Sequence, residues 1–275
     1  MDFLQALLLG VVEGLTEFLP VSSTGHLTIT EKLLGLSIDD PGVTAFTAVI
    51  QMGAIAAVIV YFRTDIVTIA SAWIRGIARP EVRGTFHYRM GWYVIVGSIP
   101  VVVVALLGKD LVTGALRNLW WVAGALIAWS LVMVAAERVG RQRRHEPDLT
   151  IKDALVIGAV QCISLIPGVS RSGATISAGL FVGLDRVTAT RMSFFLSIPA
   201  LTAAGLYELP SAIGGGVPIT STVVATIVSF AVAYVSVAWL LRFVAHHPIT
   251  WFVGYRVALG VVLIVLLATG AIAST

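Results

Sequence analysis

Two segments of the chain carry similar runs of polar residues whose types can bind phosphate or a metal ion. Residues 10–26 read GVVEGLTEFLPVSSTGH, and residues 158–175 read GAVQCISLIPGVSRSGAT. When the runs are aligned on their first glycines, Glu13 matches Gln161 and several hydroxyl residues coincide. The copies differ in charge, because Glu13 and Glu17 lie in the first and Arg171 lies in the second. This asymmetry predicts one active site assembled from two halves.

Glu13 and Glu17 form the acidic half of this site. Their i, i+4 spacing places both carboxylates on one face of a helix. Two carboxylates in a medium of low dielectric constant repel, so that one of them binds a proton or a cation lies between them. The pair can therefore act as a general base, or as ligands for a hard divalent ion such as Mg²⁺ or Ca²⁺. The structural alternative is a pair of hydrogen-bonded acids that joins the two halves.

A run of hydroxyl residues follows the acids, directly after a proline. Its members are Ser22, Ser23 and Thr24, followed by Gly25 and His26. Hydroxyl side chains after a break are good helix N-caps, and the free N–H groups at a helix N-terminus bind phosphate. His26 can orient or deprotonate a serine, protonate a leaving phosphate oxygen, or attack phosphorus itself. A structural histidine is the alternative.

The second copy supplies the basic half of the site. Around Arg171 it places Gly168, Ser170, Ser172 and Thr175 as candidate phosphate-binding residues. An arginine at membrane depth is costly unless an anion pairs with it, and its guanidinium matches phosphate in a bidentate manner. Glycines let backbone donors approach the phosphate oxygens. The alternative is a salt bridge from Arg171 to one of the two glutamates, and both arrangements can hold at different stages of a reaction.

Two further polar residues lie on expected membrane spans. Gln51 can contact the site, or it can form a hydrogen bond between helices. Arg256 lies near the end of a span, and we expect its side chain to extend to the membrane interface.

The composition places these residues in a polytopic membrane protein. The chain has 275 residues, of which 57% are hydrophobic and 12% are charged. A nucleic-acid partner is not expected, because the chain has no dense basic stripe and no recognisable nucleic-acid module. A spanning helix needs about 20 mostly apolar residues. The stretches that qualify are 43–62, 88–107, 119–137, 192–209, 219–241 and 251–272.

The two repeated runs do not qualify as spans. Each is interrupted by proline and glycine, which weaken a helix. Irregular backbone at membrane depth is tolerated only where it is buried in protein or lines a wet cavity. We therefore interpret residues 3–30 and 153–182 as re-entrant helical hairpins, in an all-α protein with six transmembrane helices.

The distribution of basic residues orients the two halves of the chain. Thirteen Lys and Arg residues are expected on one side, in the loops 62–90 and 138–152 and at Arg186, Arg191 and Arg242. The other side is expected to carry only Lys32, Lys109 and Arg117. The positive-inside rule places the first group in the cytoplasm. Three spans then follow each hairpin, in opposite orientations.

This arrangement predicts an inverted repeat within one integral membrane domain, residues 1–275. The first repeat is 1–137, the basic cytoplasmic loop is 138–152, and the second repeat is 153–275. Folds of this kind place their site near the bilayer midplane, where broken helices of both halves meet. The basic loop is expected to contact anionic membrane lipids.

The motifs resemble those of a known family. Residues 13–26 and 167–175 are similar to the two signature motifs of undecaprenyl-diphosphatase, the bacitracin-resistance membrane phosphatase of bacteria. The resemblance implies that the terminal phosphate is removed from undecaprenyl diphosphate, giving the monophosphate that carries cell-wall precursors. It also implies a multi-pass protein of the bacterial plasma membrane, a divalent cation, and a site that opens to the outer face.

The resemblance further implies roles for individual residues. By position, Glu13 and Glu17 match the essential acidic motif, Ser23 a serine proposed as the nucleophile, and His26 the motif histidine. The residues that match the second, phosphate-binding motif are Ser170, Arg171 and Thr175.

The working mechanism has Ser23 attacking the terminal phosphorus, with His26 or a glutamate taking the proton. Direct attack by water or by His26 is the competing mechanism. The rival function is a transporter or lipid flippase, because inverted repeats with broken hairpins are common in transporters. The oligomeric state is open, with a homodimer as one alternative.

Overall fold

The computed structural model describes residues 1–38, 40–108, 118–214 and 217–274, with the side chains of 211–214 excepted. Lys109 and Arg117, two of the three basic residues expected on the outer side, lie outside the described residues. Within these ranges the chain is all-helical. The α-helices are α1 (Phe3–Thr16), α2 (Ser23–Leu33), α3 (Pro41–Tyr61), α4 (Arg63–Ala78), α5 (Phe86–Leu107), α7 (Leu119–Val139), α8 (Ile151–Gln161), α9 (Arg171–Phe181), α10 (Arg186–Gly214), α11 (Ile219–Val244) and α12 (Trp251–Ala268).

Six of these helices are long and apolar enough to cross a membrane, as the hydropathy of the sequence predicts. They are α3, α5, α7, α10 from Arg186 to Pro210, α11 and α12. The expected bounds are wrong by several residues at two ends. α10 starts earlier because Asp185 caps it, accepting a hydrogen bond from the Thr188 N–H at 3.0 Å. α12 ends at Ala268 because Gly270 takes a positive φ and closes a Schellman motif.

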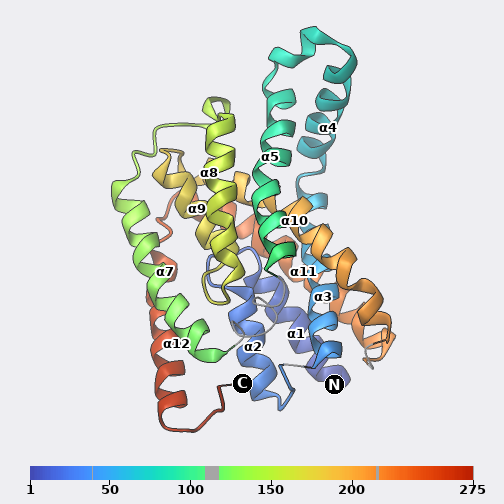
Figure 1. Cartoon of the computed structure of the whole chain (residues 1–275), viewed down its shortest axis with the longest axis vertical. Coiled ribbons are helices and arrows are strands. Elements are labelled where there is room, and N and C mark those ends of the chain that lie inside the picture. The colour runs from blue at the N-terminus through green and yellow to red at the C-terminus, as the bar shows by residue number, and fades with distance from the viewer. Residues whose placement is uncertain (39, 109–117, 215–216, 275) are drawn as a thin grey trace.

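The stretch 62–90 is not a simple loop, as the charge count assumes, because it contains helix α4. Asp65 in its first turn and Arg75 in its last turn both stabilise the helix, because their charges interact favourably with its dipole. Helix α4 packs on α5, where Tyr88 contacts Gly76 and Trp73 contacts Gly91. These two helices and the short 3-10 turn η1 (Pro80–Gly84) form the end of the molecule farthest from the termini (Figure 1).

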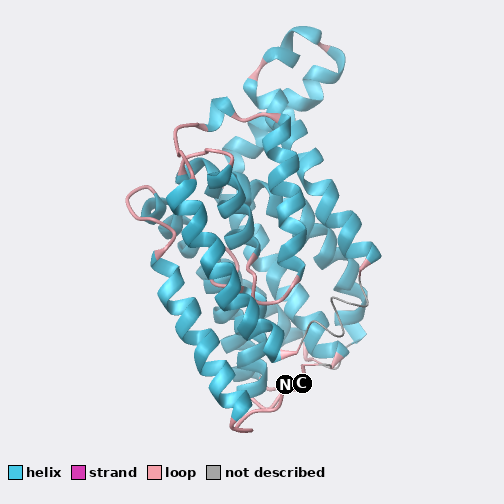
Figure 2. Ribbon diagram, turned by 60° about the vertical axis from the view of Figure 1, so that its left-hand side comes forward, coloured by secondary structure: helices cyan, strands magenta, loops and turns pink. Residues whose placement is uncertain are grey.

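Each repeated run forms two short helices joined by a loop. The first pair is α1 and α2, joined by residues 17–22, and the second is α8 and α9, joined by 162–170. The first pair lies near the end that carries both termini, and the second lies toward the α4–α5 end (Figure 1). Figure 2 shows loop segments midway along the bundle, away from both ends. The breaks that proline and glycine predict are therefore confirmed, and the two loops approach each other inside the protein.

Close glycine contacts hold both helix pairs in place. An added Cβ at Gly10 of α1 would lie 2.5 Å from the Ala225 carbonyl oxygen of α11. At the matching Gly158 of α8, it would lie 2.0 Å from the Gly97 carbonyl oxygen of α5. Backbones this close leave no room for a side chain. The first halves of both pairs are therefore fixed against long spans.

Candidate active site

The two central loops are bonded directly to each other. The backbone N–H of Gly168 donates to Ser22 Oγ at 3.1 Å, and Ser172 Oγ donates to the Leu19 carbonyl at 2.8 Å. Each bond joins residues more than 140 positions apart in the chain. The two halves of the predicted site are therefore in contact.

A serine begins the second helix of each pair in the same unusual conformation. Ser22 has φ 78° and Ser170 has φ 77°, although residues with a side chain rarely adopt positive φ. Ser22 Oγ accepts the Gly25 N–H at 3.3 Å, and Ser170 Oγ accepts the Gly173 N–H at 3.1 Å. The prediction that a hydroxyl caps the helix after the first break is confirmed, and the structure adds the equivalent cap by Ser170. Strained backbone of this kind tends to cluster at functional sites.

Arg171 forms a buried ion pair with Glu17 across the two loops. Its Nη2 lies 3.1 Å from Glu17 Oε1, and the two side chains are 10% and 3% exposed. Nη1 of Arg171 donates to the Ser193 carbonyl, whereas its buried Nε has no hydrogen-bond partner. The salt-bridge alternative holds for Glu17 in this structure. Burial of the pair means that a competing anion meets Arg171 without much intervening water.

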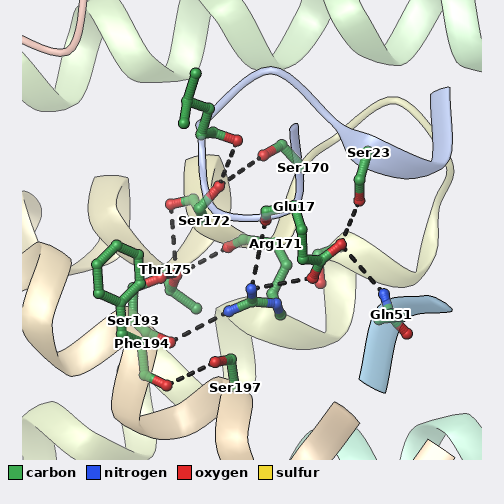
Figure 3. A network of polar contacts seen from close by, with 12 residues as sticks. Glu17, Ser23, Gln51, Ser170, Arg171, Ser172, Thr175, Ser193, Phe194 and Ser197 are labelled. Carbon is green, nitrogen blue, oxygen red and sulfur yellow. Dashed lines mark hydrogen bonds and ion pairs between the residues drawn. The ribbon is translucent and has the colours of Figure 1, made fainter. Parts of the chain in front are cut away.

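The other oxygen of Glu17 accepts two hydrogen bonds. Ser23 Oγ donates to Glu17 Oε2 at 2.5 Å, and Gln51 Nε2 donates to the same oxygen at 3.1 Å (Figure 3). A carboxylate that accepts the proton of a serine hydroxyl has the geometry of a general base. Gln51 therefore does contact the site, and Glu17 rather than His26 is the base in reach of Ser23.

His26 is bonded elsewhere. Its Nδ1 lies 2.7 Å from the Ser22 carbonyl, so Nδ1 donates, and its Nε2 lies 2.6 Å from the Tyr255 hydroxyl. The two rings are stacked, with centroids 5.5 Å apart. Tyr255 is a contact that the sequence reasoning missed, because 229 residues separate the partners. The one hint in the sequence is that Tyr255 directly precedes Arg256, a charged residue on an expected span. The catalytic role of His26 stays a prediction.

Glu13 lies one helical turn before Glu17 and is fully buried. Neither of its carboxylate oxygens has a hydrogen-bond partner. Buried oxygens without a partner are suited to binding a proton or a cation. With Glu17 and the Ser23 hydroxyl nearby in the chain, the donor set is the all-oxygen set that Mg²⁺ and Ca²⁺ prefer. Within the described residues, however, no three acidic, histidine or cysteine side chains cluster as a ready metal site.

A cavity of about 280 Å³ lies where the loops meet. The predicted residues that line it are Glu17, Ser22, Ser23, Thr24, Gln51, Ser170 and Arg171. Gln161, Ser164 and Pro167 complete the second-loop side, and small or aliphatic residues of α5 and α10 form an apolar wall. A polar pocket with an apolar wall suits a charged head group that bears an apolar chain.

Four predicted phosphate-binding residues are absent from the cavity lining but form hydrogen bonds with residues that line it. Thr175 is fully buried and donates to Ser193 Oγ at 2.7 Å, and Ser172 holds the Leu19 carbonyl. Gly25 and Gly168 both donate their backbone N–H groups to Ser22 Oγ. The expected direct contact of these four residues with phosphate stays a prediction.

Arg256 contradicts the sequence-based expectation. Its side chain does not extend to the membrane interface but is fully buried. It donates to the carbonyl of Pro20 in the first loop at 3.1 Å, and to those of Gly168 and Val169 in the second at 2.9 and 3.1 Å. Ser130 Oγ accepts a further bond from its Nε at 3.1 Å. The guanidinium therefore joins both loops, because its planar fork satisfies several carbonyls that water cannot reach.

Comparison with known proteins places the chain in a family. The sequence model of bacitracin resistance protein BacA matches residues 6–262. The chain belongs to the BacA family. It is 58% identical over 278 residues to undecaprenyl-diphosphatase 3 of Frankia casuarinae, with 100% of both chains covered. It is 55% identical to undecaprenyl-diphosphatase of Acidothermus cellulolyticus, with 99% of both chains covered. The resemblance inferred from the two motifs is confirmed.

In this BacA family member, we expect Gly168→Ala to disrupt the contact between the loops. Gly168 has φ +98°, and an added Cβ would lie 2.4 Å from the Val122 carbonyl oxygen of α7. Both the conformation and the space therefore exclude a side chain. We expect the thermal midpoint in detergent to fall by several degrees and phosphate release to fall at least tenfold. Gly124→Ala, on the same helix as Val122 but with open space around it, is the matched control. Unchanged activity in Gly168→Ala would contradict the prediction.

Proposed function

We propose that the protein is a membrane phosphatase that hydrolyses undecaprenyl diphosphate to undecaprenyl phosphate and inorganic phosphate. This reaction recycles the lipid carrier of peptidoglycan synthesis, and by keeping the diphosphate low it would confer bacitracin resistance. One observation carries the mechanism: a partly buried chain of contacts runs from Ser23 through Glu17 to Arg171 in one cavity. The two relatives named above, both undecaprenyl-diphosphatases, agree with the activity.

In the proposed mechanism, the diphosphate head group enters the cavity and draws Arg171 away from Glu17. Guanidinium binds phosphate oxygens strongly, and the exchange frees Glu17 Oε1, while Oε2 stays in position to take the Ser23 proton. Ser23 Oγ then attacks the terminal phosphorus, its proton passes to Glu17, and the bond to the bridging oxygen breaks. Undecaprenyl phosphate leaves. Water then attacks the phosphorus of the phosphoserine, the bond from phosphorus to Ser23 Oγ breaks, Ser23 recovers its proton from Glu17, and inorganic phosphate is released.

A divalent cation fits this site. Glu13 and Glu17 would hold it, and when bound it would offset the negative charge of the phosphate oxygens. The rest of the chemistry belongs to the side chains: Ser170, Ser22 and Thr24 line the head-group pocket, and Arg171 stabilises the charge on the transferred phosphate.

The proposed topology is an inverted repeat with two re-entrant hairpins in the bacterial plasma membrane. In support, the first helix of each repeat packs on a long helix of the other repeat. Helix α1 of the first repeat packs on α11 of the second, and α8 of the second packs on α5 of the first. The basic segments and the termini lie toward opposite ends (Figure 1). Val101, Val102 and Ala105 of the cavity wall lie in the half of α5 away from the basic segments, which supports an opening to the outer face.

The test is phosphate release by the purified protein in detergent, with undecaprenyl diphosphate and Mg²⁺ or Ca²⁺. Turnover without a second compartment supports the enzyme, whereas binding without release under every metal condition would instead favour a transporter or flippase. Acid quenching should trap phosphate on Ser23. Label on His26, or on no residue, would remove serine attack from the mechanism.

We expect Glu13→Gln to raise the divalent-ion concentration needed for half-maximal activity at least tenfold. The substitution keeps the shape of a side chain that has no hydrogen-bond partner, but removes one anionic ligand. The measurement is phosphate release against Mg²⁺ or Ca²⁺ concentration. Glu146→Gln, on the cytoplasmic turn η3 (Glu146–Asp148), is the control. An unchanged metal titration in Glu13→Gln would exclude Glu13 as a ligand.

A further inference from the structure

Gln161 is a buried amide without a partner. It is the last residue of α8, its exposure is 0%, and neither its Oε1 nor its Nε2 has a hydrogen-bond partner. An unsatisfied buried polar group is costly, and native proteins contain few of them. A side chain of this kind is retained at a functional site when a ligand completes its hydrogen bonds.

The amide lies on the wall of the cavity described above. It shares that wall with Ser164, Ser170 and Arg171, all from the second repeated run. Arg171 Nε on the same wall is also buried without a partner. Two residues of the cavity lining, both from the second run, therefore carry unused N–H donors, which suits a ligand that is rich in acceptor oxygens.

The repeat makes the residue type informative. Gln161 stands where the first run has Glu13, which is equally buried and equally without a partner. A carboxylate offers only acceptors, which suit a cation or proton, whereas an amide also offers two N–H donors without adding charge. The two equivalent positions therefore have different roles: Glu13 supplies acceptor oxygens in the first half, and Gln161 supplies N–H donors in the second.

The position of Gln161 is rigid. Gly158, one turn earlier on α8, packs directly on the backbone of α5 at Gly97. The backbones of α8 and α5 are therefore in direct contact one turn before the amide. An amide held in place in this way is preorganised for its ligand.

We infer that Gln161 is a substrate-binding residue whose amide N–H groups donate to phosphate oxygens of the diphosphate head group, beside Arg171. The inference rests on the proposed function for the identity of the head group. It assigns to the second repeated run a neutral donor that orients the diphosphate while Arg171 supplies the charge.

The test compares Gln161→Met with Gln161→Glu. Met has a similar length but no N–H, so we expect the KM for undecaprenyl diphosphate, and the Kd for inorganic diphosphate, to rise roughly tenfold to a hundredfold. Glu has the same shape but places a carboxylate against phosphate, and we expect a larger loss, at least a hundredfold in kcat/KM. Inorganic diphosphate binding is measured without turnover, by the thermal shift of the protein in detergent.

Stability separates a binding role from a structural one. Because Gln161→Met removes an unsatisfied amide from the interior, we expect its thermal midpoint without ligand to equal or exceed that of the original protein. A structural glutamine would give a lower midpoint. Ser177→Ala is the matched control, since Ser177 Oγ is also buried without a partner but lies outside the cavity lining. Its midpoint should likewise equal or exceed that of the original protein, whereas its diphosphate affinity should be unchanged.

The outcomes distinguish the inference from the proposed function. If the unaltered protein releases phosphate while Gln161→Met keeps its KM and its diphosphate Kd within twofold, the inference is overturned. A lower midpoint together with a lost affinity would overturn it as well. If the unaltered protein releases no phosphate but binds inorganic diphosphate in a way that depends on Gln161, the proposed function fails and the inference stands.

Discussion

Replacing Arg171 with alanine is expected to lower kcat/KM for phosphate release by about 10³-fold, because removal of one preorganised donor to a developing anion has an effect of this order. Arg171 is the one buried cation in the described cavity lining. Its guanidinium pairs with Glu17, which in turn accepts a hydrogen bond from Ser23, the candidate nucleophile. The measurement is steady-state phosphate release in detergent. Arg171→Lys should recover only a small part of the activity, since an ammonium cannot bind two oxygens in one plane.

The matched control for Arg171→Ala is Arg191→Ala. Arg191 also pairs with acids, Asp65 and Glu146, and also lies against phenylalanine rings, but it is absent from the cavity lining. We expect this variant to keep its kcat/KM within about threefold, in the range of a surface ion pair. Near-normal turnover in folded Arg171→Ala would remove the phosphate clamp from the mechanism.

Replacing Arg256 with methionine is expected to damage both stability and activity. The substitution leaves the carbonyls of Pro20, Gly168 and Val169 without their donor. Each orphaned buried acceptor costs about 1–3 kcal/mol, so we expect a loss on the order of 3 kcal/mol even after partial relaxation. Because the two loops that carry Glu17 and Arg171 then lose their common anchor, we expect phosphate release to fall at least a hundredfold.

Thermal unfolding in detergent, followed by the fluorescence of the 7 tryptophans, measures the first effect. Arg256→Lys keeps the charge but cannot reach every carbonyl, and should lie between the methionine variant and the original protein. Arg242→Met, at the end of the neighbouring helix α11, is the control. A thermal midpoint of Arg256→Met equal to that of the original protein would show that the loops do not depend on this residue for their stability.

Several site contacts followed from the sequence because the repeated motif is long. The charge difference between the copies predicted that the two runs meet, and the Glu17–Arg171 pair joins them. The hydroxyls after the first break were expected to cap a helix, and Ser22 does so. Both inferences concern short-range patterns or opposite charges, whose partners are few in a chain with 12% charged residues.

Other contacts lay beyond sequence reasoning because their partners are distant. His26 reaches Tyr255 across 229 positions, and Arg256 reaches Pro20 across 236. The choice between an interfacial and a buried Arg256 depends on whether carbonyls surround it, and no local pattern reports this. No local pattern reports either that the buried side chain of Gln161 lacks a hydrogen-bond partner, which is the observation that makes it a candidate ligand-binding residue.

The sequence by itself determined that the protein spans a membrane with six apolar helices, that two further segments are broken, and which polar residues those segments contain. These properties are local, because they depend on apolar length and on the backbone limits of proline and glycine. Only the tertiary structure decided which atoms meet: Glu17 with Ser23, Gln51 and Arg171, and Arg256 with the carbonyls of both loops. In a dry interior each polar group must find a partner, and the packing of helices far apart in the chain decides which partner is in reach.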